Sequence, residues 1–355
     1  MTHEVGFSPT SEASVNSLEP DKGLFKKMRI AIHKLFTPKI EATFSVETSS
    51  VLLNILQRLS SSTQNLPEIL NGKVFKLQTE LLIQPSTSYD TRSSTDILNF
   101  YIDSQVPSET AQKIIDKVMH TWRFLRETKN SQQVSIVLVG SRKHSKLIRS
   151  CAIMDGHPEM IIECSDPNCI SAAAHETVHA GFGAETGYPY SRDFAEGCAM
   201  RLGYQFEPTS NSSNLPAVSM VNWLKSGLTT SEPIRSSTTA LDTINAKSPL
   251  DPQHHEALKD AMAYAFGYYL VDSLLKNTNY QSKILENMKM KNIQIRKKYS
   301  WLLYLNRLYN EEGQYLGNQF TNRLALTRVF VQKLGFSLDE FRILLNDVEE
   351  SIRNA

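Results

Sequence analysis

Four short segments in the first half of the chain have the hydrophobic pattern of β-strands. Residues 73–83 alternate between apolar and polar side chains, so one face of this strand is expected to pack on a core. Residues 97–102 and 159–164 are rich in aromatic or β-branched side chains. Residues 134–139 are almost continuously apolar, which is typical of a buried strand. Between these strands, residues 108–127 carry apolar side chains at helical spacing.

The second half of the chain changes to helical spacing. Segments 168–183 and 191–203 contain many small residues and predict two consecutive helices. Further predicted helices span residues 254–276, 281–299, 301–309, 320–334 and 338–353. The last of these follows Ser337, with Glu340 three residues later, which is the pattern of a capping box.

The order of these elements predicts an α+β fold, in which a small mixed sheet precedes a mainly helical C-terminal part. Low apolar content predicts disorder at the N-terminus and a long polar loop in the middle of the chain, with one short helix near residues 218–224. The expected organisation is a polar tail (1–20), an N-terminal helical segment (21–65), a subdomain with the sheet (66–206), a polar loop (207–250) and a helical subdomain (251–355).

The segment 22–39 combines apolar residues at helical spacing with several basic residues. One interpretation is a helix that makes weak contact with a membrane surface or binds a partner protein. The other is a helix that packs on the domain and leaves a solvated basic rim, and we favour this second interpretation.

Composition excludes several classes of protein. Of the 355 residues, 41% are hydrophobic and 21% are charged, and a net charge of +1 indicates no basic surface for nucleic acid. The apolar runs are too short for a transmembrane span, and the N-terminus lacks the pattern of a secretory signal. We therefore expect a cytoplasmic protein, or one exported without an ordinary signal peptide. The oligomeric state stays open.

The cysteines are too few to form a disulfide framework in a chain of this length. They are Cys151, Cys164, Cys169 and Cys198. Free, buried thiols are therefore expected. Because the sequence contains no CxxC pair, a structural zinc site of that kind is not expected.

His175, Glu176 and His179 form an HExxH motif within the predicted helix 168–183. Histidines four residues apart project from one face of a helix, so both imidazoles can bind the same metal ion. The carboxylate of Glu176 lies beside the first imidazole, where it can take a proton from a water molecule at the metal. Chance would produce this motif in such a chain in about one case in a hundred, so its surroundings matter.

The surroundings of the motif are those of a buried metal-binding helix. Alanines 172–174 favour helix and allow a neighbour to pack closely. Gly181 and Gly183 predict that the helix ends one turn after His179. Apart from the candidate ligands, the helix is small and apolar.

A third protein ligand is expected from the helix predicted over residues 191–203. Glu196 lies there among apolar and small residues such as Gly197, which would let this helix approach the first. An unpaired carboxylate in such surroundings would be costly, so Glu196 is the favoured ligand. Glu185, six residues after His179, is the main alternative. The remaining candidates are Asp193, His254 and His255.

The HExxH motif and the segment Phe194-Ala-Glu-Gly-Cys-Ala199 together resemble the zincin metallopeptidases, specifically their gluzincin branch. The resemblance covers roughly residues 130–205. It implies that Zn²⁺ is bound by His175, His179 and Glu196, and that Glu176 is the general base. Sixteen residues separate His179 from Glu196, which shortens the connecting loop relative to the best-known gluzincins.

The same resemblance implies a zincin-like fold for residues 66–206. In that fold a sheet lies above the site, and an edge strand pairs with an extended substrate. Residues 159–164 are the candidate for this edge strand. The helix predicted over 254–276 is expected to close the opposite side of the site.

An oxyanion formed during peptide hydrolysis needs a hydrogen-bond donor. Tyr264 is the first candidate, because Tyr264-Ala-Phe-Gly267 is similar to a Tyr-x-x-Gly segment in some gluzincin aminopeptidases. The alternative role for Tyr264, and the more frequent one, is an ordinary core aromatic. The other candidate donors are Tyr188, Tyr190, His254 and His255. Asp193 is a candidate to orient the ligand imidazoles.

The predicted function is therefore a zinc-dependent peptidase acting on a protein or peptide, with endopeptidase activity as the default. An aminopeptidase would need an acidic anchor for the substrate amine, for which Glu159 and Glu163 are candidates. A bacterial effector acting inside a host cell is a further possibility. Two other classes are an inactive zincin-like binding or scaffold protein and a helical interaction protein with an accidental motif.

Overall fold

The computed structural model describes most of the chain between residue 74 and the C-terminus, together with one isolated strand near the N-terminus. The described residues are 43–47, 74–83, 94–127, 130–140, 151–153, 158–186, 192–208, 214–229, 261–293, 295, 297–316 and 323–355. The predicted tail 1–20, the segment 22–39 and most of the predicted loop 207–250 lie outside these residues.

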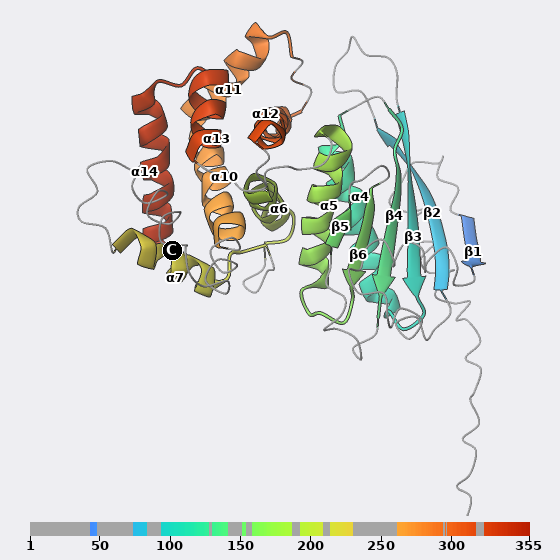
Figure 1. The fold of residues 1–355 in the computed structure, drawn as a ribbon. Helices are drawn as coiled ribbons and strands as arrows, with labels where there is room; N and C mark the ends of the chain where they lie inside the picture. Colours follow the sequence, from blue (N-terminus) through green and yellow to red (C-terminus); the bar gives the residue numbers. More distant parts are fainter. Residues whose placement is uncertain are drawn as a thin grey trace, which may run out of the picture.

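The first half of the described chain forms a mixed sheet of six strands in the order β1-β2-β3-β4-β6-β5 (Figure 1). Strands β3, β4 and β6 are parallel, whereas β1 with β2, β2 with β3, and β5 with β6 are antiparallel. The strands are β1 (Thr43–Glu47), β2 (Val74–Ile83), β3 (Ser94–Asp103), β4 (Gln133–Val139), β5 (Cys151–Ile153) and β6 (Glu159–Glu163). The prediction of a mixed sheet upstream of the helix predicted over 168–183 is confirmed.

Two strands were not predicted, and they change the edges of the sheet. Strand β1 lies within the segment 21–65, which was predicted to be helical, so that prediction is wrong for residues 43–47. Strand β5 pairs with residues 159–161 of β6, so the prediction that 159–164 form an edge strand is wrong for this half of the segment. Both missed strands are short, and β5 has only 3 residues, too few to display an alternating pattern.

Helices α4 (Ser108–Leu125) and α5 (Cys169–Thr186) cover one face of the sheet. Successive strand residues point to opposite faces, so the apolar residues at every second position share one core. That core contains Leu77, Leu81, Leu98, Phe100, Ile136, Leu138, Met160 and Ile162 from the strands, Ile115, Val118 and Trp122 from α4, and Ala173 and Ala180 from α5.

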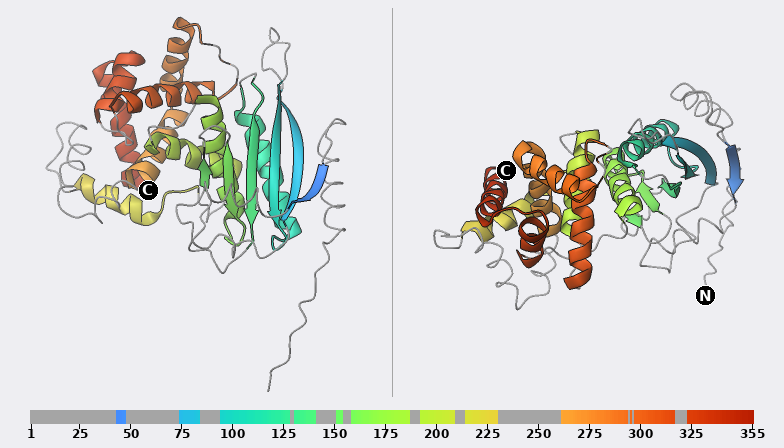
Figure 2. Two further views of the ribbon diagram at one scale, coloured as in Figure 1. Left: turned by 45° about the vertical axis from the view of Figure 1, so that its right-hand side comes forward. Right: turned by 90° about the horizontal axis from the view of Figure 1, so that it is seen from above.

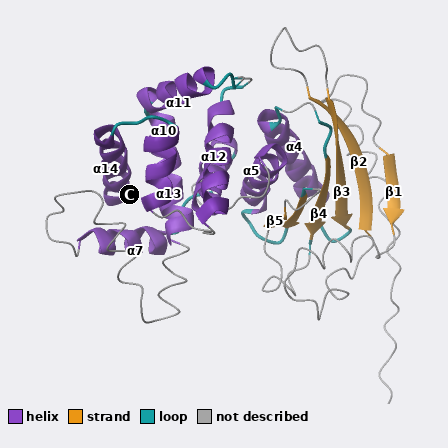
Figure 3. Cartoon of the chain, turned by 45° about the horizontal axis from the view of Figure 1, so that its top comes forward, coloured by secondary structure: helices purple, strands orange, loops and turns teal. Residues whose placement is uncertain are grey.

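The rest of the described chain is helical, as predicted, and packs around a second core (Figure 3). Two of its segments, η2 and η3, are π-helical and adjoin α-helices. The elements are α6 (Arg192–Phe206), α7 (Val218–Thr229), η2 (Ala261–Phe266), α10 (Gly267–Lys276), α11 (Thr278–Met290), α12 (Ser300–Leu316), α13 (Arg323–Thr327), η3 (Arg328–Lys333) and α14 (Leu338–Asn354). The capping box before α14 is confirmed, because Ser337 Oγ accepts from the Glu340 amide and Glu340 Oε2 from the Ser337 amide.

The helix predicted over 281–299 ends early, at Met290. Asn292 adopts a left-handed conformation with φ 55°, which an asparagine tolerates and which stops the helix. Lys297 then donates from Nζ to the carbonyls of Arg123 and Arg126 at the C-terminal end of α4. A lysine that satisfies these helix-end carbonyls ties the helical half of the molecule to the sheet half.

Helix α5 lies between the sheet and the helical half, as Figure 1 and Figure 2 show, and contributes residues to both cores. Its Ala173 and Ala180 pack toward the sheet, while Val178 and Phe182 belong to the core of the helical half. The helix continues to Thr186, so the predicted stop at Gly181 and Gly183 is wrong. Gly181 instead allows close packing, because a Cβ at this position would lie 2.9 Å from Cδ1 of Leu125 on α4.

The described residues include the side chains of three of the four cysteines and all the helices that can be compared with the predictions on thiols and membrane spans. Cys164, Cys169 and Cys198 are free and buried, as predicted. No helix in the described part of the chain combines the length and the apolar character needed to cross a bilayer.

Candidate metal centre

The structure brings together the three residues predicted to bind the metal. His175 and His179 project from α5, and their Nε2 atoms are 3.1 Å apart. Oε2 of Glu196 on α6 lies 3.2 Å from Nε2 of His175 and 3.1 Å from Nε2 of His179. Among the described residues, these three form the one group of His, Cys, Asp or Glu side chains arranged to hold a metal ion.

The triangle of donor atoms fits a zinc ion. Four ligand atoms about 2.0 Å from a tetrahedral ion are separated from one another by about 3.3 Å. The separations of 3.1 to 3.2 Å between the two nitrogens and the oxygen match this value. Two histidines and one carboxylate are also a common donor set of catalytic zinc sites, in which the fourth position is open.

Helix α6 is held in place by an unusually close approach to α10. Gly197 follows Glu196 directly, and a Cβ on Gly197 would overlap the backbone carbonyl of Gly267. A Cβ on Gly267 would in turn overlap the carbonyl of Asp193. The small residue beside Glu196 was predicted to bring α6 close to α5, but Gly197 serves the contact with α10 instead.

Burial and neighbouring charges give the two carboxylates of the site different proton affinities. The pKa of Glu176 is raised to about 7, mainly by burial, with the charge of His175 opposing the rise and the charge of Glu196 adding to it. Burial also acts to raise the pKa of Glu196, but the charges and hydrogen bonds of His179 and His175 hold it well below its ordinary value. In the metal-free protein Glu196 is therefore ionised, as a metal ligand has to be, whereas Glu176 holds its proton more tightly than an ordinary carboxylate.

Tyr264 lies in the π-helical segment η2, which packs on α6. Its hydroxyl oxygen accepts a hydrogen bond from Nη2 of Arg192 at 3.4 Å. Burial raises the pKa of Tyr264 to about 12, and the charges of Glu196 and Glu176 also raise it, so the hydroxyl stays protonated and can donate. π-Helical turns are frequent at functional sites. The role of Tyr264 as oxyanion donor stays a prediction.

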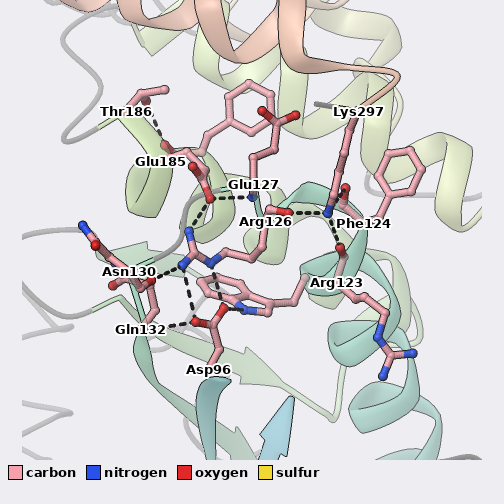
Figure 4. Close-up of polar contacts among 12 residues, drawn as sticks. Asp96, Arg123, Phe124, Arg126, Glu127, Asn130, Gln132, Glu185, Thr186 and Lys297 are labelled. Carbon is pink, nitrogen blue, oxygen red and sulfur yellow. Dashed lines mark hydrogen bonds and ion pairs between the residues drawn. The ribbon is translucent and has the colours of Figure 1, made fainter. Parts of the chain in front are cut away.

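Glu185, the main alternative ligand, is engaged elsewhere (Figure 4). Its Oε1 accepts from Nη1 of Arg126 and, at 2.8 Å, from the amide of Glu127. Arg126 is fully buried and also donates from Nε to Asp96 on β3 at 2.7 Å. Glu185 thus anchors the C-terminal end of α5 to the sheet and is not part of the metal centre.

The other predicted candidates have different outcomes. Asp193 is buried. The pKa of Tyr309 on α12 is raised mainly by the burial of Tyr309 and secondly by the charge of Asp193. Asp193 does not orient His175, because the buried Nδ1 of His175 has no hydrogen-bond partner among the described residues. Tyr188, Tyr190, His254 and His255 lie outside the described residues.

One residue of the centre was missed in the sequence. Arg192 precedes Glu196 by one helical turn, and its Nε lies 3.8 Å from Oε1 of Glu196. Its guanidinium also lies over the ring of Tyr264, 5.5 Å from the centroid. The spacing of four residues before the predicted ligand was the signal that could have indicated it.

Comparison with known proteins gives few matches. No protein-family model matches the chain, and no curated protein matches it. Two solved structures show some similarity, an M1 zinc metallopeptidase from Deinococcus radiodurans and a mutant of an M1 zinc metallopeptidase from the same organism, with 12% and 11% sequence identity and a TM-score of 0.35 for each. The matches cover 77% and 87% of this chain but only 51% and 61% of those chains. Similarity at this level carries no weight for function, and the chemistry of the centre follows from its own residues.

The donor geometry predicts one zinc ion per chain. Replacing Glu196 with Gln should lower zinc affinity by at least about a hundredfold, because even residues behind a metal ligand change affinity by about 10- to 100-fold. Competition with a chelating dye would measure the affinity, and Glu350→Gln, an exposed residue on α14, is the control. Unchanged affinity in Glu196→Gln would remove Glu196 from the ligand set.

Proposed function

We propose that this protein is a zinc-dependent peptidase that hydrolyses peptide bonds in a protein or peptide substrate. The proposal depends on one observation, the convergence of His175, His179 and Glu196 on a single point with Glu176 buried beside them. Glu176 follows His175 directly on α5, and the charges of His175 and Glu196 act on its carboxylate, so that carboxylate lies near the same point.

A zinc ion bound at this centre would polarise the scissile carbonyl and lower the pKa of the attacking water toward neutrality. Glu176 takes the proton from that water and transfers it to the leaving amine. A base can perform both transfers when its pKa is near the working pH, and burial acts to raise the pKa of Glu176 from the ordinary range of a carboxylate toward that value. Tyr264 donates a hydrogen bond to the oxyanion that develops on the carbonyl oxygen.

Replacing Tyr264 with Phe tests this last role. The substitution removes one hydroxyl and changes packing little, so kcat should fall by about a hundred- to a thousandfold if the hydroxyl stabilises the oxyanion. Thermal unfolding should be nearly unchanged. Tyr304→Phe is the control, because its hydroxyl bonds Asn287 in the helical core and should affect stability rather than rate. An unchanged rate in Tyr264→Phe would make Tyr264 a core residue.

We favour an endopeptidase over an aminopeptidase. An aminopeptidase needs an acidic group to bind the substrate amine, and Glu159 and Glu163 were the candidates. Both side chains are mostly buried, Glu159 lies where β6 pairs with β5, and Glu163 accepts a hydrogen bond from Ser165. Neither side chain is therefore exposed to bind a substrate amine. Action as an effector inside a host cell stays a prediction from the sequence.

Mass-spectrometric profiling of new peptide termini in a cell lysate tests the proposal. The zinc-loaded protein should generate specific new termini, removal of the metal with a chelator should abolish them, and added zinc should restore them. A zinc-loaded protein that generates no new termini in lysates or peptide libraries would support the alternative of an inactive binding or scaffold protein. A protein that binds no zinc would contradict both.

A further inference from the structure

The stretch from residue 287 to residue 310, which includes the connection between α11 and α12, has a high density of positive charge. It contains six basic residues and no acidic residue, in a chain whose net charge is only +1. The basic residues are Lys289, Lys291, Arg296, Lys297, Lys298 and Arg307. Figure 1 shows α11 at the periphery of the helical half, where the chain turns back toward α12.

Three lysines of this stretch differ from most other lysines of the described chain, because they have no acidic partner. Five lysines elsewhere each lie within 2.8 Å of a carboxylate oxygen, and they are Lys113, Lys117, Lys276, Lys283 and Lys333. Lys289, Lys291 and Lys298 are exposed, and within the described part of the chain none of them forms an ion pair. Their charges are therefore not balanced by a neighbouring acid.

The contacts that two of these lysines do make are with aromatic rings at the start of α12. Nζ of Lys291 lies 5.9 Å from the ring centroid of Tyr304, and Nζ of Lys298 lies 5.2 Å from that of Tyr299. A ring attracts the ammonium group but leaves its charge in place. Exposed Arg307 follows Tyr304 by three residues on α12 and is therefore its neighbour on the helix surface.

Apolar side chains are exposed in the same connection. Met290 lies between two of the lysines and is 75% exposed, and Ile295 is 37% exposed. The backbone that carries Met290 is held by hydrogen bonds from the amides of Asn292 and Ile293 to the carbonyls of Lys289 and Met288, at 2.9 and 2.8 Å. The lysines and the methionine are thus presented from a formed turn, and binding here need not first order the backbone.

This combination fits a lipid surface better than a nucleic acid or a protein. Base stacking requires exposed aromatic rings, but the aromatic residues of the stretch are at most 6% exposed, namely Tyr299, Trp301, Tyr304 and Tyr309. A protein partner would need a matching acidic and apolar surface of about 800 Å². Lysine is a point charge on a flexible stem, which suits mobile phosphate headgroups, and exposed aliphatic side chains gain from entering the layer beneath them.

We propose that this part of the molecule binds the anionic face of a phospholipid membrane. The α11–α12 surface, as we call it, consists of Lys289, Met290, Lys291, Ile295 and Lys298. The lysines attract the headgroups, while Met290 and Ile295 enter the boundary between headgroups and acyl chains. The surface includes no residue of the metal centre, so the proposal does not depend on the proposed function. It is also separate from the segment 22–39.

Co-sedimentation of the full chain with lipid vesicles tests the proposal. The protein should bind vesicles of phosphatidylcholine and phosphatidylserine in equal amounts about a hundredfold more tightly than vesicles of phosphatidylcholine alone, because each of three lysines near an anionic surface contributes about fivefold. Raising NaCl from about 0.1 M to about 1 M should remove most of this preference, since the Debye length falls from about 10 Å to about 3 Å. Equal binding to both kinds of vesicle at low salt would overturn the proposal.

A triple variant assigns the binding to the α11–α12 surface. Replacing Lys289, Lys291 and Lys298 with Gln should remove most of the preference for phosphatidylserine. Thermal unfolding should be nearly unchanged, because the three side chains are exposed. The matched control removes the same charge from exposed side chains that have acidic partners, Lys113, Lys276 and Arg342, and should bind nearly as the wild type does. Unchanged binding by the first variant would place the contact elsewhere in the chain and overturn the proposal.

Met290→Trp tests the apolar part of the contact. Phosphatidylcholine brominated on its acyl chains quenches a tryptophan that enters the lipid, whereas Trp122 and Trp301 are buried in the protein, with 0% and 2% exposure. Fluorescence of the variant on vesicles that also contain phosphatidylserine should therefore be quenched more than that of the wild type. No additional quenching would contradict insertion at the α11–α12 surface. Binding of duplex DNA that the lysine triple variant loses, together with no binding to either vesicle, would assign the surface to nucleic acid instead.

Discussion

Replacing Glu176 with Gln is expected to lower kcat/KM for peptide cleavage by at least about a hundredfold while the protein keeps its zinc. Glutamine has nearly the same size and can still form hydrogen bonds, but its amide cannot accept the proton of the attacking water. The residue is not one of the three ligands, so the donor triangle of His175, His179 and Glu196 should be intact. Cleavage of a peptide identified by lysate profiling and zinc content per chain are the two measurements.

The loss of activity in Glu176→Gln should not come from unfolding. The folded metal-free protein disfavours the ionised form of Glu176, because burial raises its pKa from 4.5 to about 7. The free energy of unfolding of the wild-type protein should therefore fall as the pH rises from about 4.5 to 7, because Glu176 ionises less readily in the folded state. The variant has no ionisable group at position 176 and should lack this contribution. Above pH 7 the metal-free variant should be at least as stable as the wild type. Cleavage by the variant at the wild-type rate would contradict the mechanism.

The convergence of the candidate ligands was predictable because much of it depends on local geometry. His175 and His179 share a helix face through their spacing alone, and Glu176 follows as their neighbour in the chain. Glu196 depended on a tertiary contact, and it was identified because a carboxylate among apolar residues requires a partner. The capping box before α14 was predictable for the same reason as the histidine pair, since its hydrogen bonds join residues three positions apart.

The features that were missed depend on contacts between distant segments. Glycine is common at helix ends, but Gly181 lies inside α5 because Leu125 of α4 occupies the space of its side chain. Strand β5 exists through its pairing with β6, and its own sequence is too short for a pattern. Arg192 reads as an ordinary charged residue at a helix start until Tyr264, 72 residues later, is placed against its guanidinium.

Alanine in place of Gly267 is expected to have the largest effect on stability, a fall in the free energy of unfolding of about 3 kcal/mol or more. An added methyl group at this position overlaps the backbone carbonyl of Asp193 on α6. A backbone atom cannot move aside as a side chain can, so α6 and α10 must separate. Glu196 lies on α6 within one turn of this contact, so zinc affinity should fall with stability. Urea denaturation of the metal-free protein and a zinc competition assay measure the two effects.

Gly181→Ala is the matched control for Gly267→Ala, because it adds the same methyl group at another helix contact. There the methyl meets Cδ1 of Leu125, a flexible side-chain atom, at 2.9 Å. Part of that clash can be relieved by a change of the leucine rotamer, and alanine is the better helix former, so the cost should be only about 1 kcal/mol. Equal losses in the two variants would mean that the contact between α6 and α10 is not closer than an ordinary helix contact. Loss of stability in Gly267→Ala with unchanged zinc affinity would mean that the contact does not position Glu196.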